Sequence, residues 1–190
     1  MTAEGTDFAF GGRLCLDLTW TLRYRSIAPT EVLREPADLG RWITVALAPM
    51  TEPVAPGLLG EAVRLREAIH AAARAVIAGR AIARADRAVI NETAMAPGPQ
   101  HRLDTNGEVA VDLRPGAEVE SALAAIATDA IELLATRDGR LRACAGPDCS
   151  LLFHDSSRPG RRRWCAAARC GNRVNTAAYR RRRADGPTEL

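Results

Sequence analysis

The chain has 190 residues, of which 47% are hydrophobic and 26% are charged, and its formal net charge is +3. This composition is typical of a globular protein and excludes wholesale disorder. No stretch approaches the roughly 18 apolar residues that a membrane span requires, and the first residues lack the pattern of a signal peptide. We therefore expect a cytoplasmic protein without a membrane partner.

The small net charge hides an asymmetry. Residues 150–184 contain ten arginines and a single acid, Asp155, so the remainder of the chain is mildly acidic. A basic segment at one end is typical of nucleic-acid-binding proteins, although exposed runs of charge are also often solvated tails.

The first element in chain order is predicted at residues 14–22. Leucines and Trp20 alternate there with a second set that includes Cys15, Asp17 and Thr19. A period of two predicts a half-buried β-strand. Cys15 lies far from the other cysteines and is interpreted as a buried core thiol.

Helices are predicted where apolar residues recur with a period of 3.6. They cover the segment between Pro36 and Pro49, residues 58–77 up to Gly79, residues 85–95, and residues 117–135. Between the last two, Asn106-Gly107 predicts a β-hairpin closed by a type I′ turn. These elements make residues 1–138 an α+β domain of mixed helices and strands, and the turn-forming residues 136–139 mark its boundary.

Four cysteines distinguish the remaining segment, residues 139–190. Cys144, Cys149, Cys165 and Cys170 form two C-x4-C pairs separated by 15 residues. In a reducing compartment this spacing favours a metal site over disulfides, and four thiolates suit tetrahedral Zn²⁺. The sequence therefore predicts one structural zinc ion per chain without an open coordination position for catalysis.

The order of elements around the cysteines predicts a treble-clef zinc finger. Two short strands flank the first pair, and Cys170 opens a terminal helix, while Trp164 is expected to pack over the metal centre. On the helix Arg173, Thr176, Arg180 and Arg183 fall on one face, with a spacing suited to a nucleic-acid groove.

Two stretches of the sequence resemble known families. CAGPDCSLLFHDSSRPGRRRWCAAARCGNR, with Cys170-Gly171-Asn172-Arg173 intact, resembles the CGNR zinc finger, and FGGRLCLDLTWT resembles the start of the ABATE domain that accompanies it. The family's Leu-Asp-x-x-Asn-Thr pattern is matched except that Trp20 replaces Asn. Beyond the CGNR motif, Asn175 stands where a lysine is common.

This resemblance implies a bacterial transcription regulator that responds to stress, with a ligand-binding N-terminal domain and a DNA-binding finger. The residues expected to contact nucleic acid are Arg158, Arg161, Arg162, Arg163, Arg169, Asn172, Arg173, Asn175, Arg180 and Arg183. Asp17, Trp20, Arg23 and Trp42 are candidate ligand-binding residues, with a buried ion pair and core aromatic rings as the alternative interpretation.

No catalytic constellation is recognisable in residues 1–138, where His70 and His101 have no identifiable partner, so enzymatic activity is not expected. The alternative to a DNA-binding regulator is a zinc-stabilised adaptor that binds RNA or protein, since fold alone does not select the partner. The sequence leaves the ligand and the oligomeric state open.

Overall fold

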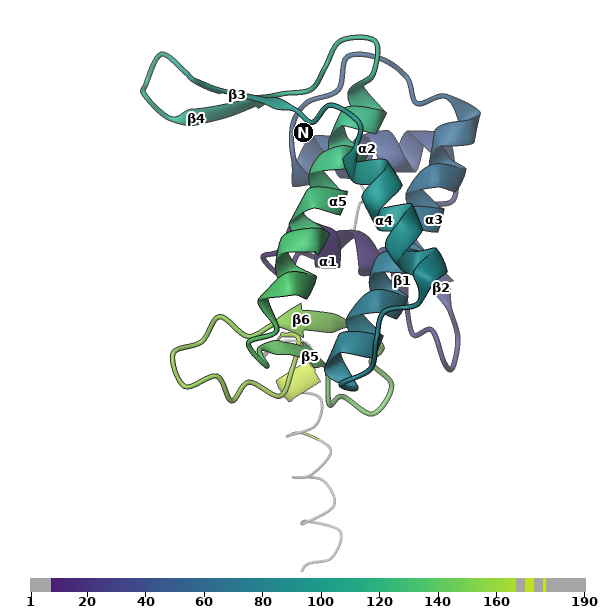
Figure 1. Ribbon diagram of the computed structural model, residues 1–190, viewed down its shortest axis with the longest axis vertical. Helices are drawn as coiled ribbons and strands as arrows, with labels where there is room; N and C mark the ends of the chain where they lie inside the picture. Colours follow the sequence, from purple (N-terminus) through teal and green to yellow (C-terminus); the bar gives the residue numbers. More distant parts are fainter. Residues whose placement is uncertain (1–7, 167–169, 173–175, 177–190) are drawn as a thin grey trace, which may run out of the picture.

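The computed structural model describes residues 8–166, 170–172 and 176. The described part of the chain forms five helices and three separate two-stranded antiparallel sheets, which confirms the α+β class. Their arrangement is shown in Figure 1. The helices are α1 (Leu14–Thr19), α2 (Pro36–Ala46), α3 (Pro56–Ile77), α4 (Arg84–Ala94) and α5 (Glu118–Thr136). The strands are β1 (Leu22–Arg23), β2 (Thr30–Glu31), β3 (Gln100–Leu103), β4 (Val109–Asp112), β5 (Leu141–Ala143) and β6 (Leu152–His154).

Helices α3, α4 and α5 pack against one another and supply most of the core (Figure 1). Their apolar faces follow the 3.6-residue period, so the helices predicted from the sequence are confirmed, with ends shifted by only a few residues. Helix α3 ends at a left-handed glycine, Gly79, whose N–H donates to Val76 O while Arg80 N–H donates to Ala75 O. These two bonds satisfy carbonyls that the end of a helix would otherwise leave free.

The strand predicted at residues 14–22 is wrong, because the segment forms helix α1 followed by the very short β1. Helix α1 lies across α3 and α5 and also contacts β6, so both of its faces are covered. Its polar residues are as buried as its leucines and bond locally: Thr19 Oγ1 donates to Leu16 O at 2.7 Å. A short helix buried on all sides has no polar face to reveal its period, and the alternation of residue types was misleading.

The hairpin of β3 and β4 is confirmed, with Leu103 paired to Val109, but its type I′ turn is wrong. Gly107 has φ +78°, whereas Asn106 is not in the left-handed region that a type I′ turn requires. The loop is longer: Gly107 N–H donates to Asp104 O at 3.1 Å, and Asp104 N–H donates to Glu108 O at 2.8 Å. This is a type I turn followed by a glycine bulge.

Strands β5 and β6 lie at the end of the helical bundle opposite to that hairpin (Figure 1), and pair with Leu141 opposite His154. Leu141 and Leu152 belong to the same buried cluster as the helices, and β5 contacts α3. The cysteine-rich segment is thus packed onto the helices. The domain division at residue 138 stays a prediction.

Candidate metal centre and basic loop

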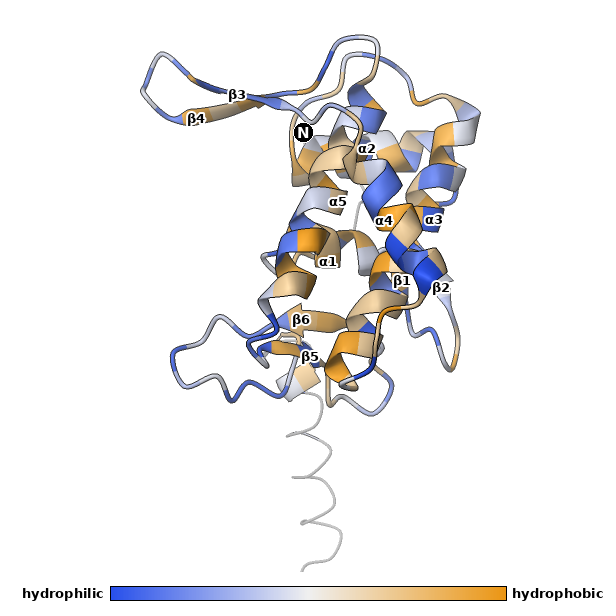
Figure 2. Cartoon of the chain, in the orientation of Figure 1, coloured by the Kyte–Doolittle hydropathy of each residue, from blue (hydrophilic) through white to orange (hydrophobic). Residues whose placement is uncertain are grey.

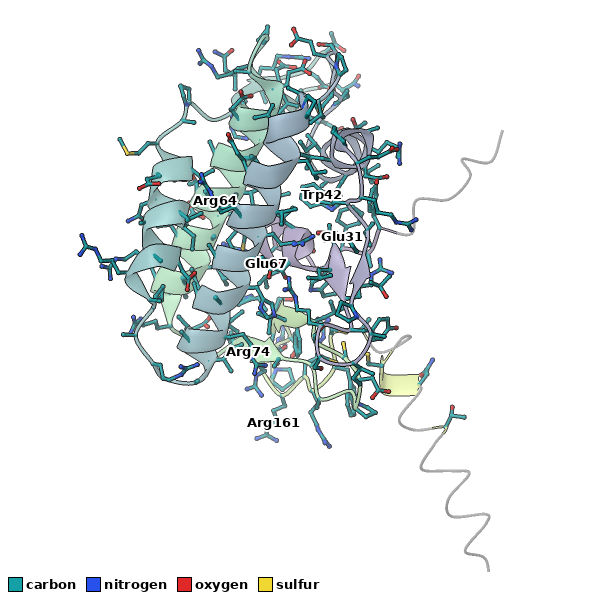
Figure 3. All side chains as sticks on the ribbon, turned by 90° about the vertical axis from the view of Figure 1, so that its right-hand side faces the viewer. Glu31, Trp42, Arg64, Glu67, Arg74 and Arg161 are labelled. Carbon is teal, nitrogen blue, oxygen red and sulfur yellow. The ribbon has the colours of Figure 1, made fainter. Side chains whose placement is uncertain are left out.

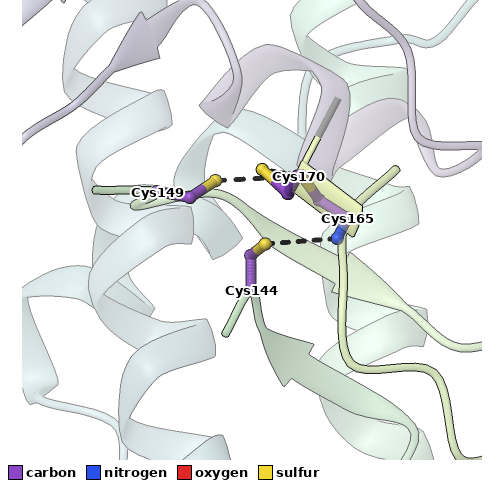
Figure 4. A group of neighbouring side chains, drawn as sticks. All are labelled: Cys144, Cys149, Cys165 and Cys170. Atoms are coloured by element: carbon purple, nitrogen blue, oxygen red, sulfur yellow. Dashed lines mark hydrogen bonds between the residues drawn. The ribbon is translucent and has the colours of Figure 1, made fainter. Parts of the chain in front are cut away.

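The four cysteines of the two C-x4-C pairs converge at this end of the molecule (Figure 4). Cys144 and Cys149 come from the knuckle between β5 and β6, Cys165 follows the loop after β6, and Cys170 lies in the first helical turn beyond it. Their sulfur atoms all lie within 4.8 Å of one another. Elements far apart along the segment therefore present four soft ligands to one point.

The geometry fits zinc. Zinc–sulfur bonds of about 2.3 Å in a tetrahedron require sulfur–sulfur separations of about 3.8 Å. The Cys149 and Cys165 sulfurs are 3.8 Å apart, and the Cys165 and Cys170 sulfurs are 3.7 Å apart. The backbone N–H groups of Gly146 and Cys165 point at Cys144 Sγ, at 3.4 and 3.3 Å. These four residues can bind one zinc ion, and four thiolates leave no position for a substrate.

The contacts between Cys144, Cys149 and Cys165 oppose the ionisation of all three thiols at once. Hydrogen bonds from the Cys149 and Cys165 thiols lower the pKa of Cys144. The same hydrogen bonds raise the pKa values of the two donors. The bond to Cys144 raises the pKa of Cys149 to about 12 and also raises the pKa of Cys165. A bound dication removes this conflict, because metal binding releases the thiol protons.

Two glycines permit close packing at the metal centre, one between the cysteine pairs and one against Trp164. A Cβ added at Gly146 would lie 3.1 Å from Cys149 Cβ and 3.2 Å from Cys170 Sγ. A Cβ at Gly171 would lie 3.3 Å from the ring of Trp164, which packs against the buried cluster around the cysteines. The expected packing of Trp164 at the metal centre is thus confirmed.

Trp20 joins the helical part of the chain to the metal centre. It is buried in one cluster with Phe153 and the cysteines, and its Nε1 donates to Leu152 O at 2.7 Å. Gly11 lies against its ring, where an added Cβ would be 2.8 Å from the nearest ring carbon. The Trp20 ring is therefore packed as a core aromatic side chain, which is the alternative to ligand binding that the sequence analysis left open.

The other candidate ligand-binding residues do not gather around Trp20. Trp42 is 1% exposed and belongs to the main helical core, a different buried cluster. Asp17 accepts a hydrogen bond from Gly11 N, and burial raises its pKa to about 6. Arg23 is half-buried in β1. None of these residues lines the two cavities beside the C-terminal end of α5, and their role in ligand binding stays a prediction.

The loop between β6 and Cys165 is fixed by an internal acid. Asp155 is fully buried and accepts hydrogen bonds from Ser157 Oγ at 2.6 Å and Arg162 N at 2.8 Å. The Ser157 hydroxyl is the main cause that lowers the pKa of Asp155 to about 2. Arg140 Nη1 reaches Ser157 O at 2.8 Å, and Arg142 Nη2 reaches Gly160 O at 2.8 Å. The single acid of the basic segment thus organises its loop.

The arginines of this loop divide into two groups. Arg162 is half-buried, donates to the carbonyls of Trp164 and Cys165, and stacks over Phe153, so it is held by the fold. Arg158 and Arg161 are exposed, and Figure 3 shows Arg161 directed away from the body at the end of the molecule. Arg163 is exposed and lies over the Trp164 ring. Hydrophilic colours accordingly dominate this loop in Figure 2.

Of the predicted helical stripe, Thr176 is among the described residues and is exposed. Asn172 is exposed in the turn that begins at Cys170. The remaining predicted contacts, namely Arg169, Arg173, Asn175, Arg180 and Arg183, lie outside the described residues.

One group near the metal centre was missed by sequence reasoning. Arg25 N–H donates to Ser150 Oγ at 3.2 Å, next to Cys149, and its guanidinium donates to Glu67 Oε1 on α3 at 3.1 Å. His70, one turn further along α3, contacts the Ser150 backbone. From the sequence, the i, i+3 spacing of Glu67 and His70 shows only that they share a face of one helix. It does not show that this face meets Arg25 and the loop that contains Ser150.

Comparison with protein families gives two matches. Residues 12–137 match the ABATE model, described as a putative stress-induced transcription regulator, and residues 140–183 match the CGNR zinc finger. The resemblances stated from the sequence are confirmed. No curated protein matches the chain. None of the helices in the described residues is both long and apolar enough to span a membrane.

Proposed function

Because the chain belongs to the ABATE family and carries a CGNR zinc finger, we propose that it is a DNA-binding, stress-responsive transcription regulator acting in the cytoplasm. One zinc ion has a structural role in this proposal, the N-terminal domain receives the signal, and no catalytic step is involved.

The observation that carries the proposal is the exposed basic loop beside the metal centre. Arg158 and Arg161 are exposed and form no ion pair with the described residues. The loop that bears them is anchored by Asp155 and by Cys165. Arginines on a fixed loop can grip phosphates at defined positions, whereas a solvated tail supplies only diffuse attraction.

DNA binding is tested by using the zinc-loaded full chain to select bound fragments from genomic DNA. We expect an enriched sequence that is bound about 10³-fold or more above random duplex at the same salt concentration. Enrichment of RNA instead, or the absence of any nucleic-acid binding, contradicts the proposal and supports the adaptor.

The basic loop is tested by Arg161→Ala, with Arg64→Ala as the matched control. Arg64 is also exposed but lies on α3, away from the metal centre (Figure 3). Arg161→Ala is expected to weaken binding to every duplex and to reduce the slope of log K against log salt by about 0.9, the value for one phosphate contact. The affinity measured by fluorescence anisotropy should be unchanged in Arg64→Ala. Equal losses in both variants mean that the loop has no special role.

A further inference from the structure

A cavity of about 300 Å³ lies where α3 and α5 end and the chain enters β5. Its walls include the apolar side chains of Val76, Ile77, Leu133 and Leu141. Ligand pockets in proteins usually measure about 300–1,000 Å³. The volume therefore suits a small molecule, and the walls require that much of it be apolar.

The same cavity is lined by two arginines, Arg80 and Arg137. Both are exposed, and neither forms an ion pair within the described residues. Asp138, the acid on the rim, accepts Arg140 N–H at 2.9 Å and lies 3.3 Å from His154 Nε2, and its carboxylate forms no ion pair with Arg80 or Arg137. The cavity thus combines apolar walls with two guanidinium groups that have no salt-bridge partner in the described part of the chain.

The end of α3 opposes a negative charge less strongly than an uncapped helix end does. The last carbonyls of α3 are partly satisfied, since Gly79 and Arg80 donate their N–H groups back to Val76 and Ala75. Arg137 is held with φ +45°, in the left-handed region that is uncommon for a residue with a side chain. Arg137 lines both this cavity and a smaller neighbouring one of about 190 Å³.

We propose that this cavity binds a small organic acid, with its apolar body against the aliphatic walls and its carboxylate between Arg80 and Arg137. Guanidinium groups bind carboxylates through charge-assisted hydrogen bonds, which are stronger than neutral ones. Gly139 and Leu141 also line the cavity and lead directly into β5. A bound acid would therefore contact the segment that leads into the cysteine-rich residues. The idea that this acid acts as a signal rests on the proposed regulator function.

Binding is tested on the zinc-loaded full chain without DNA, so that failure of the regulator function is distinguishable from failure of this site. The probes are benzoate, its neutral counterpart benzamide, hexanoate, and inorganic phosphate. Backbone amide chemical shifts are followed by NMR during titration. We expect saturable shifts with benzoate or hexanoate, clustered at residues 76–80 and 133–141, and at least tenfold weaker binding of benzamide and phosphate.

Two substitutions locate the carboxylate. Arg80→Gln removes one charge, and Arg137→Asn removes the other with a residue that tolerates the left-handed backbone. Each is expected to weaken binding of the acid about tenfold or more, whereas Arg64→Gln, with the same change in net charge outside the cavity, leaves it unchanged. Preserved amide dispersion in each variant shows that the fold is intact.

Three results overturn the proposal. They are the absence of localised shifts with every acid, binding of benzamide or phosphate as tight as that of benzoate, and an equal loss of affinity in Arg64→Gln. If the acids bind here but do not change DNA affinity, the site stands and its regulatory role is wrong.

Discussion

Buried charge is concentrated around one arginine. Arg66 is 2% exposed, and its Nη1 and Nη2 each lie 2.7 Å from an oxygen of Glu31. Its Nε donates to Glu67 Oε1 at 2.8 Å, and Glu67 is shared with Arg25. A buried guanidinium is tolerated only when its donors are satisfied in this way, and removal of one partner would leave an uncompensated charge. The network fixes β2 and the loop after β1 on α3.

His70 borders this network and is expected to make stability depend on pH. Burial, followed by the positive charge of Arg25, lowers its pKa to about 4, while Glu67 acts in the opposite direction and Arg74 adds to the lowering. The folded state therefore holds His70 neutral. Its contribution to stability is full above the unfolded pKa of about 6.5 and is lost as the pH falls toward the folded pKa.

The effect is measurable by urea unfolding of the parent and of His70→Gln at pH 7.5 and 5.5. The parent should lose about 1 kcal/mol more than the variant over this interval, a figure reduced for the partial exposure of the ring. Protonation of the cysteines is common to both proteins and cancels in the comparison. Identical losses in the two proteins would show that His70 titrates normally.

At the scale of elements, the sequence was informative wherever one face of an element meets solvent. The helices of the bundle alternate apolar and polar faces, and the cysteine spacing encodes the knuckle directly, so both were predictable. Helix α1 was not predictable from periodicity, because α3, α5 and β6 cover it on all sides. The positions of Trp20 and Trp42 in separate clusters depend on tertiary packing, which residue type alone does not specify.

The hairpin of β3 and β4 depends on one backbone conformation. Gly107 has φ +78° and an added Cβ would meet no atom within 4 Å, so the cost of Gly107→Ala comes from the backbone alone. We expect about 1 kcal/mol of destabilisation, confined to the hairpin because it projects from the body (Figure 1). Faster hydrogen exchange of the β3 and β4 amides measures it.

The control for the hairpin is Gly98→Ala. Gly98 also has open space around its Cβ position but an ordinary φ, so this change should leave exchange in the hairpin unaltered. If both variants behave alike, the left-handed conformation at the turn is not what holds the hairpin together.

At the scale of the whole molecule, the metal centre and the helical core are mechanically joined. Trp20 follows α1, bonds to β6 and lies in the cluster formed by the cysteines, while Leu152 lies in the main core. Loss of the metal should therefore destabilise residues beyond those that bind it.

Cys165→Ser tests this connection, with Cys15→Ala as the control because Cys15 is buried away from the cluster. Metal analysis should find one zinc ion per chain in the parent and in Cys15→Ala, and a loss of zinc in Cys165→Ser. Hydrogen exchange should then increase in β5, β6 and α1, while α3 and α5 keep their protection because most of their contacts are with one another. Full zinc retention in Cys165→Ser would refute the ligand assignment. Unchanged protection of α1 after zinc loss would instead show that the Trp20 contact does not transmit the state of the metal centre to the helices.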